Sequence, residues 1–369
     1  MSDIASVRKY LMSWLWLLAS IPSTKHTITL PTMKQSIIVL LLATVLAVSA
    51  FQTGSVISSR SSSAASGALF SAVADEETAV QSDLLKRDRY VATNRFTVRQ
   101  GRAAKFEKRW ATRSSRLAEL PGFKYFQLMR RVGLDDAENS GIDPLASENP
   151  FGNYVSFTIW DEKKHFNAWR GGEAFKEAHG GTSLFAFVTT MVSSAMVLEG
   201  APKPAFYDGL LQQSTVPDQV PETVNGWRNV EADGKNLLPA EAFIACNQFF
   251  VPPANAVAFE QRWANRTSKL KECEGFVSFS MLRRDVKAKG HGISPMGEEE
   301  PTYMSTTVWK DRKSFEQWRN GNAFKEAHGE KKGEEAKEQP KQPPAPLWSK
   351  PPVPVFYEST LVISSPDGA

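Results

Sequence analysis

The chain has 369 residues, of which 41% are hydrophobic and 23% are charged, a composition typical of a soluble globular protein with room for two domains. Its formal net charge of +4 is small for this length, and much of it lies in an acid-poor N-terminal stretch, which argues against a nucleic-acid-binding protein. The two cysteines, Cys246 and Cys273, are too few for a disulfide framework and lack a metal-binding spacing, so both are expected to be reduced.

Residues 1–75 are predicted to be a targeting leader that is removed or mostly disordered. After Met33 and Lys34, an apolar run over 37–48 ends in Val-Ser-Ala, the pattern of a secretory signal that is too short for a membrane span. Residues 51–74 are rich in serine and contain no acid, which is typical of a transit peptide. The combination resembles the bipartite leader of algae with secondary plastids and predicts a plastid (chloroplast) location. A secreted or endomembrane protein is the alternative.

One passage occurs twice in the chain. Residues 166–180 read FNAWRGGEAFKEAHG and residues 315–329 read FEQWRNGNAFKEAHG, with eleven of fifteen positions identical. The repetition extends upstream, where NRFTV at 94–98 matches NQFFV at 247–251, an offset of 153 residues. Repetition over such a length predicts two copies of one structural unit.

Both copies show the same order of expected elements. A strand is followed by an amphipathic helix with apolar residues at the helical period, then by two strands separated by a polar loop, a helix, a short helical segment and a final strand. Asp161 and Asp311 are expected to cap the second helix of each copy. The expected strands are 90–99, 123–131, 154–160 and 204–211 in copy one and 242–251, 276–284, 303–309 and 353–363 in copy two.

The order β-α-β-β-α-β is that of a ferredoxin-like domain, which leaves one face of its sheet uncovered. Two such sheets within one chain can cover each other, so the predicted fold is α+β, an intrachain pseudo-dimer that forms a dimeric α+β barrel. The domains are expected over 88–211 and 242–364, joined by a linker over 212–241 that contains Trp227, which is expected to pack on a domain. A charged, Pro-rich insert over 329–352 is expected to be disordered or extended.

Of the five histidines, only His179 and His328 recur at equivalent positions. A histidine on a helix is more often structural, but neutral imidazole is also a common ligand of metals and heme iron. The residues around both histidines suit a porphyrin: aromatic rings for its faces, cations for its propionates and an amide donor on the first strand. Aromatic core packing and solvated cations are the alternative interpretation. The candidates are Trp169, Phe175, Arg170, Lys176 and Asn94 in copy one, and Trp318, Phe324, Arg319, Lys325 and Asn247 in copy two.

The pattern N-R-F-T, then T-[IV]-W, then F-x-x-W-x-x-x-x-[AV]-F-K-x-A-H resembles the antibiotic-biosynthesis-monooxygenase superfamily, and within it the heme-degrading monooxygenases of the IsdG type. The resemblance implies paired ferredoxin-like domains and a functional triad in which His ligates heme iron, Trp presses on the porphyrin and Asn hydrogen-bonds the distal ligand. Heme is then both substrate and cofactor, used with O2 and an external reductant such as ferredoxin or another reductase. By position, the triads are Asn94, Trp169 and His179, and Asn247, Trp318 and His328.

Two other functions stay open on the sequence. One is a heme or tetrapyrrole carrier without turnover, and the other is a cofactor-independent monooxygenase that acts on an aromatic substrate; the histidine kept in both copies argues against the latter. The copies also differ. An apolar stretch over 183–198 follows His179 and is expected to wall a pocket or form a core helix, whereas the Pro-rich insert follows His328. Copy one is therefore expected to be the more competent site.

Overall fold

The structure is a computed structural model that describes residues 83–134, 152–178, 193–288, 296–297, 299–327 and 346–368. The predicted leader over 1–75, both recurring histidines, His179 and His328, and most of the predicted insert lie outside the described residues. Within the described residues, no helix is both long and apolar enough to cross a membrane.

Both repeats contain the predicted β-α-β-β-α-β order. Repeat one comprises β1 (Arg89–Phe96), α4 (Ala103–Ala111), β2 (Phe123–Val132), β3 (Tyr154–Trp160), α5 (Lys163–Gly171), α6 (Glu173–Ala178) and β4 (Lys203–Ser214). Repeat two comprises β7 (Ala242–Phe249), α8 (Ala256–Ala264), β8 (Phe276–Arg284), β9 (Tyr303–Trp309), α9 (Arg312–Asn320), α10 (Asn322–Ala327) and β10 (Val353–Ser364). Between them, β5 (Thr223–Val224) and β6 (Trp227–Arg228) pair as a short antiparallel ribbon.

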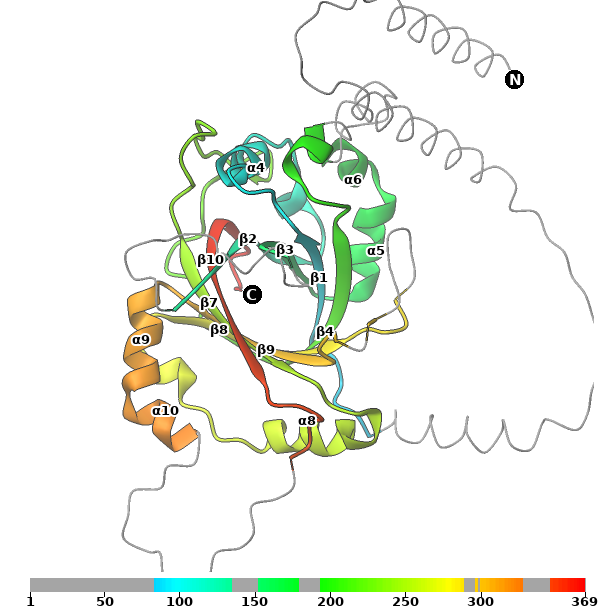
Figure 1. Ribbon diagram of the computed structural model, residues 1–369, viewed down its shortest axis with the longest axis vertical. Coiled ribbons are helices and arrows are strands. Elements are labelled where there is room, and N and C mark those ends of the chain that lie inside the picture. Colours follow the sequence, from blue (N-terminus) through cyan, green and yellow to red (C-terminus); the bar gives the residue numbers. More distant parts are fainter. Residues whose placement is uncertain are drawn as a thin grey trace, which may run out of the picture. The chain divides into compact units, whose positions relative to one another are not determined.

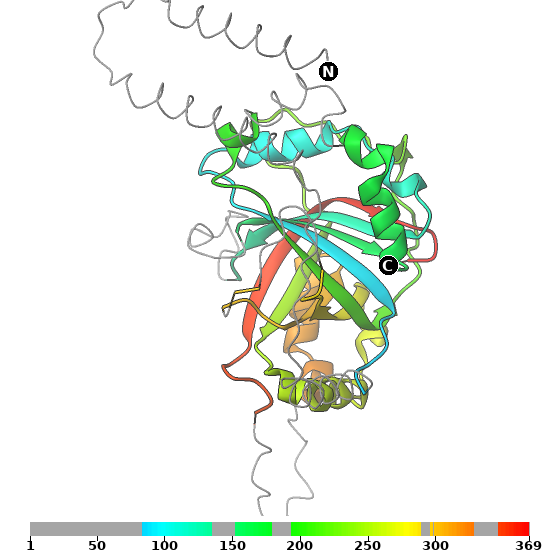
Figure 2. The same ribbon diagram turned by 90° about the vertical axis from the view of Figure 1, so that its right-hand side faces the viewer.

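Eight antiparallel strands form one closed barrel in the order β1-β3-β2-β10-β7-β9-β8-β4, with β4 returning to β1. Each repeat supplies a four-stranded half, and the halves join where β2 pairs with β10 and where β8 pairs with β4. The helices of the two repeats lie on opposite sides of this barrel (Figures 1 and 2). The predicted intrachain dimeric α+β barrel is confirmed.

The last strand of each repeat belongs to both halves. The first part of β4 pairs with β1 and the later part with β8, and a register shift separates Leu210 from Gln213. At these shifts Leu211 and Leu361 take left-handed backbone angles, with φ of 52° and 54°. A non-glycine residue rarely adopts such an angle, and an irregularity of this kind bends and twists a strand. The two matching bends thus let β4 and β10 pass from one half-sheet to the other.

Successive side chains of each strand point to opposite faces of the sheet, which separates one core inside the barrel from two cores outside it. Val91, Phe157, Tyr207, Ile244 and Tyr357 belong to the cluster of inward-facing side chains that fills the barrel. The opposite face of each half-sheet packs against the helices of its own repeat, through the clusters that contain Phe106 and Phe166 in repeat one and Phe259 and Phe315 in repeat two. A cavity between these helices and the sheet therefore lies on the outer face of one half-sheet.

A buried carboxylate anchors the first helix of repeat one. Glu107 on α4 is fully buried and accepts hydrogen bonds from Arg130 Nη1 at 2.8 Å, Tyr154 Oη at 2.7 Å and Leu238 N at 2.6 Å. Arg130 also binds Glu358 on β10, at 2.6 Å. Although burial lowers the pKa of Arg130, Glu107 and Glu358 raise it above its ordinary value, so this arginine stays charged. Burial and Glu107 likewise raise the pKa of Tyr154.

Repeat two contains the same cluster. Glu260 on α8 accepts from Arg283 Nη1 at 2.9 Å, Tyr303 Oη at 2.7 Å and Leu85 N at 2.6 Å. Arg283 reaches Asp208 on β4 at 3.1 Å. Each cluster thus binds its own repeat to the last strand of the other repeat and to the segment that enters the other repeat's first strand.

Local details depart from the sequence-based expectations. Asp311 caps α9 as expected, because its Oδ1 accepts a hydrogen bond from Ser314 N at 2.7 Å. The matching prediction for Asp161 is wrong: α5 begins after Glu162, and Asp161 instead forms ion pairs with Arg89 and Lys124, both at 3.5 Å. His165 stands where repeat two has Ser314, so the first turn of α5 lacks the hydroxyl that Asp311 also binds. Both cysteines are free, as expected.

The cluster around Glu107 yields a stability prediction. Replacing Arg130 with Leu leaves the buried carboxylate without its cation, which is expected to lower the free energy of unfolding by about 3–5 kcal/mol. The exposed pair of Lys164 with Glu162 provides the control, since Lys164→Ala should cost less than about 1 kcal/mol. Urea unfolding measures both variants. If the free energy of unfolding of R130L lies within about 1 kcal/mol of that of the parent, the cluster does not stabilise the pairing of β2 with β10.

Candidate functional site

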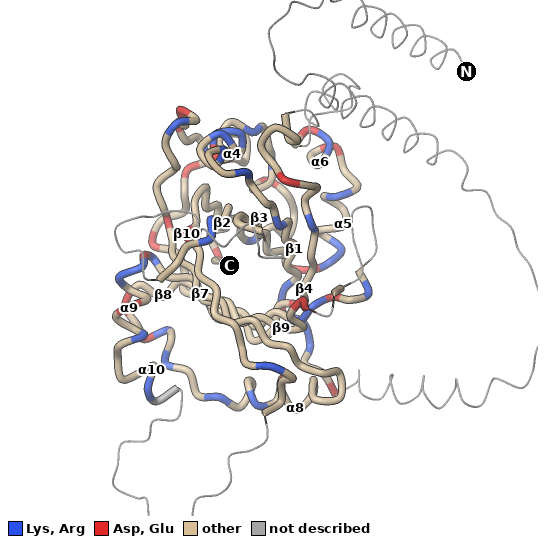
Figure 3. Tube along the Cα trace, in the orientation of Figure 1, with Lys and Arg blue, Asp and Glu red and all other residues tan. Residues whose placement is uncertain are grey.

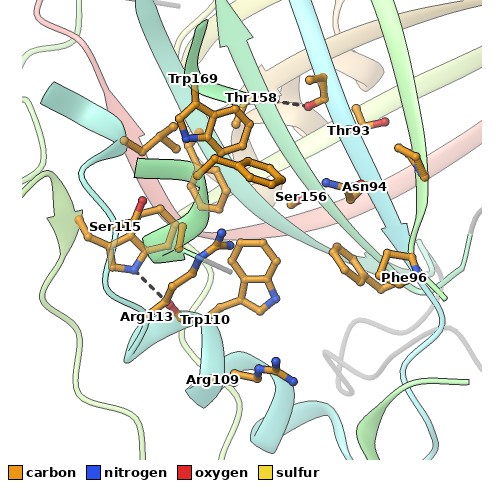
Figure 4. Close-up of a pocket in the computed structure, with 18 of the residues that line it drawn as sticks. Thr93, Asn94, Phe96, Arg109, Trp110, Arg113, Ser115, Ser156, Thr158 and Trp169 are labelled. Atoms are coloured by element: carbon orange, nitrogen blue, oxygen red, sulfur yellow. Dashed lines mark hydrogen bonds between the residues drawn. The ribbon is translucent and has the colours of Figure 1, made fainter. Parts of the chain in front are cut away.

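Repeat one holds a cavity of about 600 Å³ between its helices and the outer face of its half-sheet (Figure 4). This volume lies within the range of small-molecule and cofactor pockets. The wall is largely aromatic, with a few hydroxyl groups and three arginines. Its aromatic members are Phe96, Phe106, Trp110, Phe126, Phe166, Trp169, Phe175, Phe206 and Trp227; the arginines are Arg109, Arg113 and Arg170.

The floor of the cavity comes from β1 and the strands beside it. Ala92, Asn94 and Phe96 alternate along β1 and line the cavity, and Ser156 of β3 lies opposite Asn94. Thr158 donates its hydroxyl to Ala92 O at 3.0 Å, so that its own polar group is satisfied by the sheet. Asn94 is half-buried, which leaves an amide at the floor of a chamber whose lining also includes hydroxyl groups, three arginines and Glu177.

Trp169 on α5 forms the aromatic wall with its neighbours. Its ring stacks on Trp160 at a centroid distance of 5.6 Å and meets Phe175 edge-on at 5.1 Å. Trp318 has the same surroundings in repeat two, with Trp309 at 5.3 Å and Phe324 at 5.0 Å. These rings therefore pack against the core and, in repeat one, line the cavity at the same time.

Two arginines that the sequence analysis did not assign to the site, Arg109 and Arg113, project from α4 and the turn after it (Figure 4). Arg109 Nη1 donates to Ser194 Oγ at 2.8 Å. The guanidinium of Arg113 lies over the rings of Trp110, at 4.7 Å, and Trp227, at 5.9 Å. Burial, with the nearby charge of Arg109, lowers the pKa of Arg113 to about 10. A ligand anion at this edge would offset the cost of burying that charge.

A sequence signal for these arginines exists. Both recur in repeat two, as Arg262 and Arg266, whereas the exposed cations of the same helix do not: Lys105 and Lys108 are replaced by Ala258 and Gln261. Figure 3 shows several basic residues along α4, so basic character alone does not distinguish the two arginines that line the cavity. Repetition separates them from the rest.

The predicted site residues divide between the cavity and the surface. Asn94, Trp169, Arg170 and Phe175 all line the cavity, with Arg170 also 5.8 Å from the ring centre of Phe166. Lys176 is exposed, pairs with Glu173 at 2.6 Å and does not line the cavity. In repeat two Asn247, Arg319 and Lys325 are exposed, and Trp318 and Phe324 are half-buried.

The two histidines themselves lie outside the described residues, but Ala178, which precedes His179, lines the cavity. Ser194, Val197 and Leu198 from the apolar stretch over 183–198 also line it, as one of the two interpretations of that stretch expected. Trp227 from the predicted linker is buried, donates its Nε1 to Trp110 O at 3.0 Å and completes the wall.

Fold and site together define a duplicated ferredoxin-like protein with an aromatic, arginine-edged cavity over the first strand of repeat one. The family model for antibiotic biosynthesis monooxygenase matches residues 89–181 and 242–330, one match in each repeat. The chain belongs to this family of monooxygenases.

Two curated relatives have the same name, heme oxygenase (staphylobilin-producing). The protein from Staphylococcus haemolyticus is 34% identical over 90 residues, which are 24% of this chain and 72% of the relative. The protein from Staphylococcus saprophyticus is 35% identical over 94 residues, 26% of this chain and 76% of the relative.

Solved structures are more distant in sequence. One from Fusobacterium nucleatum covers 77% of this chain and 98% of its own, with 11% identity and a TM-score of 0.45. An anthrone oxidase-like protein covers 76% of this chain and 94% of its own, with 12% identity and a TM-score of 0.38.

The geometry predicts that the cavity binds aromatic anions. The dye 1-anilinonaphthalene-8-sulfonate should bind with enhanced fluorescence, and Arg113→Met should weaken its binding about tenfold or more, because a hydrogen bond to a charged group contributes about 1.5–3 kcal/mol. Lys164→Met, which removes an exposed charge that does not line the cavity, is the control. Equal dye affinity in the parent and both variants would show that Arg113 does not face the ligand.

Proposed function

We propose that repeat one binds heme in this cavity and opens the porphyrin oxidatively, releasing iron, with O2 and electrons from an external donor. The observation that carries the proposal is the gathering of Asn94, Trp169 and the residue before His179 around one aromatic cavity. The two relatives named heme oxygenase support the choice of substrate.

The chemistry of the lining residues fits heme. A porphyrin is a flat apolar ring with two propionates on one edge, and it needs aromatic faces and cations at one side of its site. The rings of Trp169, Phe175 and Phe206 supply the first. Arg109 and Arg113, which both project from α4 and the turn after it, supply the second, and Arg170 of α5 is a further cation in the lining. Arginine suits carboxylates because its planar fork can bind both oxygens.

Each triad member would have its own role. His179 would ligate the iron, since neutral imidazole is a common heme ligand. Asn94 would donate a hydrogen bond from the floor of the cavity toward the distal side. Trp169 would press on the porphyrin; Trp160 stacks behind it and Phe175 meets its edge, so its ring has little room to yield. The heme supplies the oxygen chemistry, and the protein supplies orientation, distortion and exclusion of water.

The electron donor and the location are parts of the same proposal. Opening a porphyrin with O2 consumes electrons, which no described residue of the chain supplies. If the leader directs the protein to a plastid, ferredoxin or another reductase is the donor that we propose, and the released iron would be recycled there.

A heme or tetrapyrrole carrier is the second candidate, because the same cavity and ligand would serve binding without turnover. The third candidate is a cofactor-independent monooxygenase acting on an aromatic substrate. The aromatic cavity accommodates such a substrate equally well, but this function gives the repeated histidine no chemical role.

Hemin titration tests the proposal. Addition of hemin to the purified protein should shift the Soret band, and His179→Ala should abolish that shift because the iron loses its ligand. Ascorbate or reduced ferredoxin in the presence of O2 should then bleach the band and release iron. A band that persists under reductant and O2 would leave the carrier, and the absence of any spectral change would leave the cofactor-independent monooxygenase.

Trp169 offers a separate prediction. Trp169→Ala should keep measurable hemin binding but slow turnover on the order of ten- to a hundredfold, because a misplaced substrate loses near-attack geometry. Trp318→Ala removes a ring with matching aromatic neighbours in repeat two and should leave turnover close to the parent rate. Single-turnover bleaching of bound heme measures both. Equal slowing in the two variants would assign Trp169 to packing alone.

A further inference from the structure

The connection that enters the last strand is anchored in the same way in both repeats. In repeat one Glu199 N donates to Thr97 O at 2.7 Å, and in repeat two Ser349 N donates to Phe250 O at 2.8 Å. The acceptors are equivalent, since each follows the phenylalanine, Phe96 or Phe249, that closes the first strand. In both repeats the anchored residue lies four positions before the last strand begins.

This match makes Leu198 and Trp348 equivalent, because each directly precedes its anchored residue. Leu198 is 7% exposed and lines the cavity of repeat one. Repeat two places an indole, which is much larger than a leucine side chain, at the same point. The carbonyls of the preceding residues are also hydrogen-bonded, although their donors are not equivalent: Val197 O accepts from Arg99 N at 2.9 Å, and Leu347 O accepts from Asn255 Nδ2 at 3.2 Å.

The indole of Trp348 lies against the counterparts of cavity-lining residues. Its ring centre is 6.2 Å from that of Phe249, the equivalent of Phe96. The guanidinium carbon of Arg262, the equivalent of Arg109, lies 5.8 Å from the same indole. In repeat one Arg109 contacts Ser194 instead and its side chain lines the cavity (Figure 4).

We propose that Trp348 blocks the porphyrin cleft of repeat two, so that the chain takes one heme, in repeat one, although both repeats keep Asn, Trp and His. The inference rests on the proposed function. The indole occupies the arginine edge where propionates would enter, and it engages Arg262 through the face of its ring. A rigid macrocycle cannot bend around the Trp348 indole, so the size of the side chain at this position determines which repeat binds heme.

A reciprocal exchange tests the proposal, with hemin as the probe and heme stoichiometry read from Soret titration and native mass spectrometry. The parent protein should bind one heme per chain and Trp348→Leu should bind two. Adding His328→Ala to Trp348→Leu should return the count to one, which places the second heme in repeat two. Leu198→Trp should abolish binding in repeat one and leave a chain without heme.

The outcomes separate this inference from the proposed function. A parent chain without heme sinks the proposed function itself. Two hemes on the parent chain, or one on a folded Trp348→Leu chain, would overturn the role of Trp348. Circular dichroism checks the fold of each variant. If Trp348→Leu does not fold, Leu198→Trp decides alone, because retention of one heme at parental affinity would overturn the steric argument.

Discussion

The closed barrel depends on two buried carboxylates, Glu107 and Glu260. Each holds an arginine that reaches the last strand of the other repeat and accepts a backbone N–H from the segment entering the other repeat. An ion pair buried in this way adds little net stability over apolar packing, but a wrong arrangement that leaves one partner uncompensated is costly. A shifted register at the β2–β10 or β8–β4 junction would separate these partners, so the clusters favour the observed registers there.

Closure of the barrel also determines where a ligand can bind. The core around Tyr207 and Tyr357 fills most of the space between the inner faces of the half-sheets and leaves a cavity of only about 20 Å³, so the cavity large enough for a ligand lies on an outer face. There the helices of repeat one form the cavity over their own first strand, and the helices of repeat two pack on the equivalent face of the other half-sheet. Because the chain carries both repeats, the copy of this surface in repeat two can change without altering the cavity of repeat one. Trp348, which stands where repeat one has Leu198, and the different segments that follow the two histidines are such differences between the copies.

The cavity of repeat one joins packing and chemistry in the same side chains. Trp169 belongs to the core through Trp160 and Phe166, and its ring also lines the chamber. Arg113 lies on Trp110 and Trp227 at a cost in solvation that lowers its pKa to about 10. A site whose lining residues also pack against the core is preorganised, because its walls cannot relax independently of that core. This is the property that distortion of a flat substrate would require.

The sequence by itself determined the element order, the duplication and the barrel, because hydrophobic periodicity and internal repetition can be read directly from the order of residues. It also singled out Asn94 and Trp169, since both copies keep them. Only the tertiary structure decided that Arg113 and Trp227 line the cavity, that Asp161 pairs with Arg89 rather than capping α5, and that Leu198 and Trp348 are equivalent. These facts depend on contacts between segments that are distant in sequence. The segments that follow the two histidines are too different for Leu198 and Trp348 to be aligned from sequence, and tertiary packing determines which side chains are in contact.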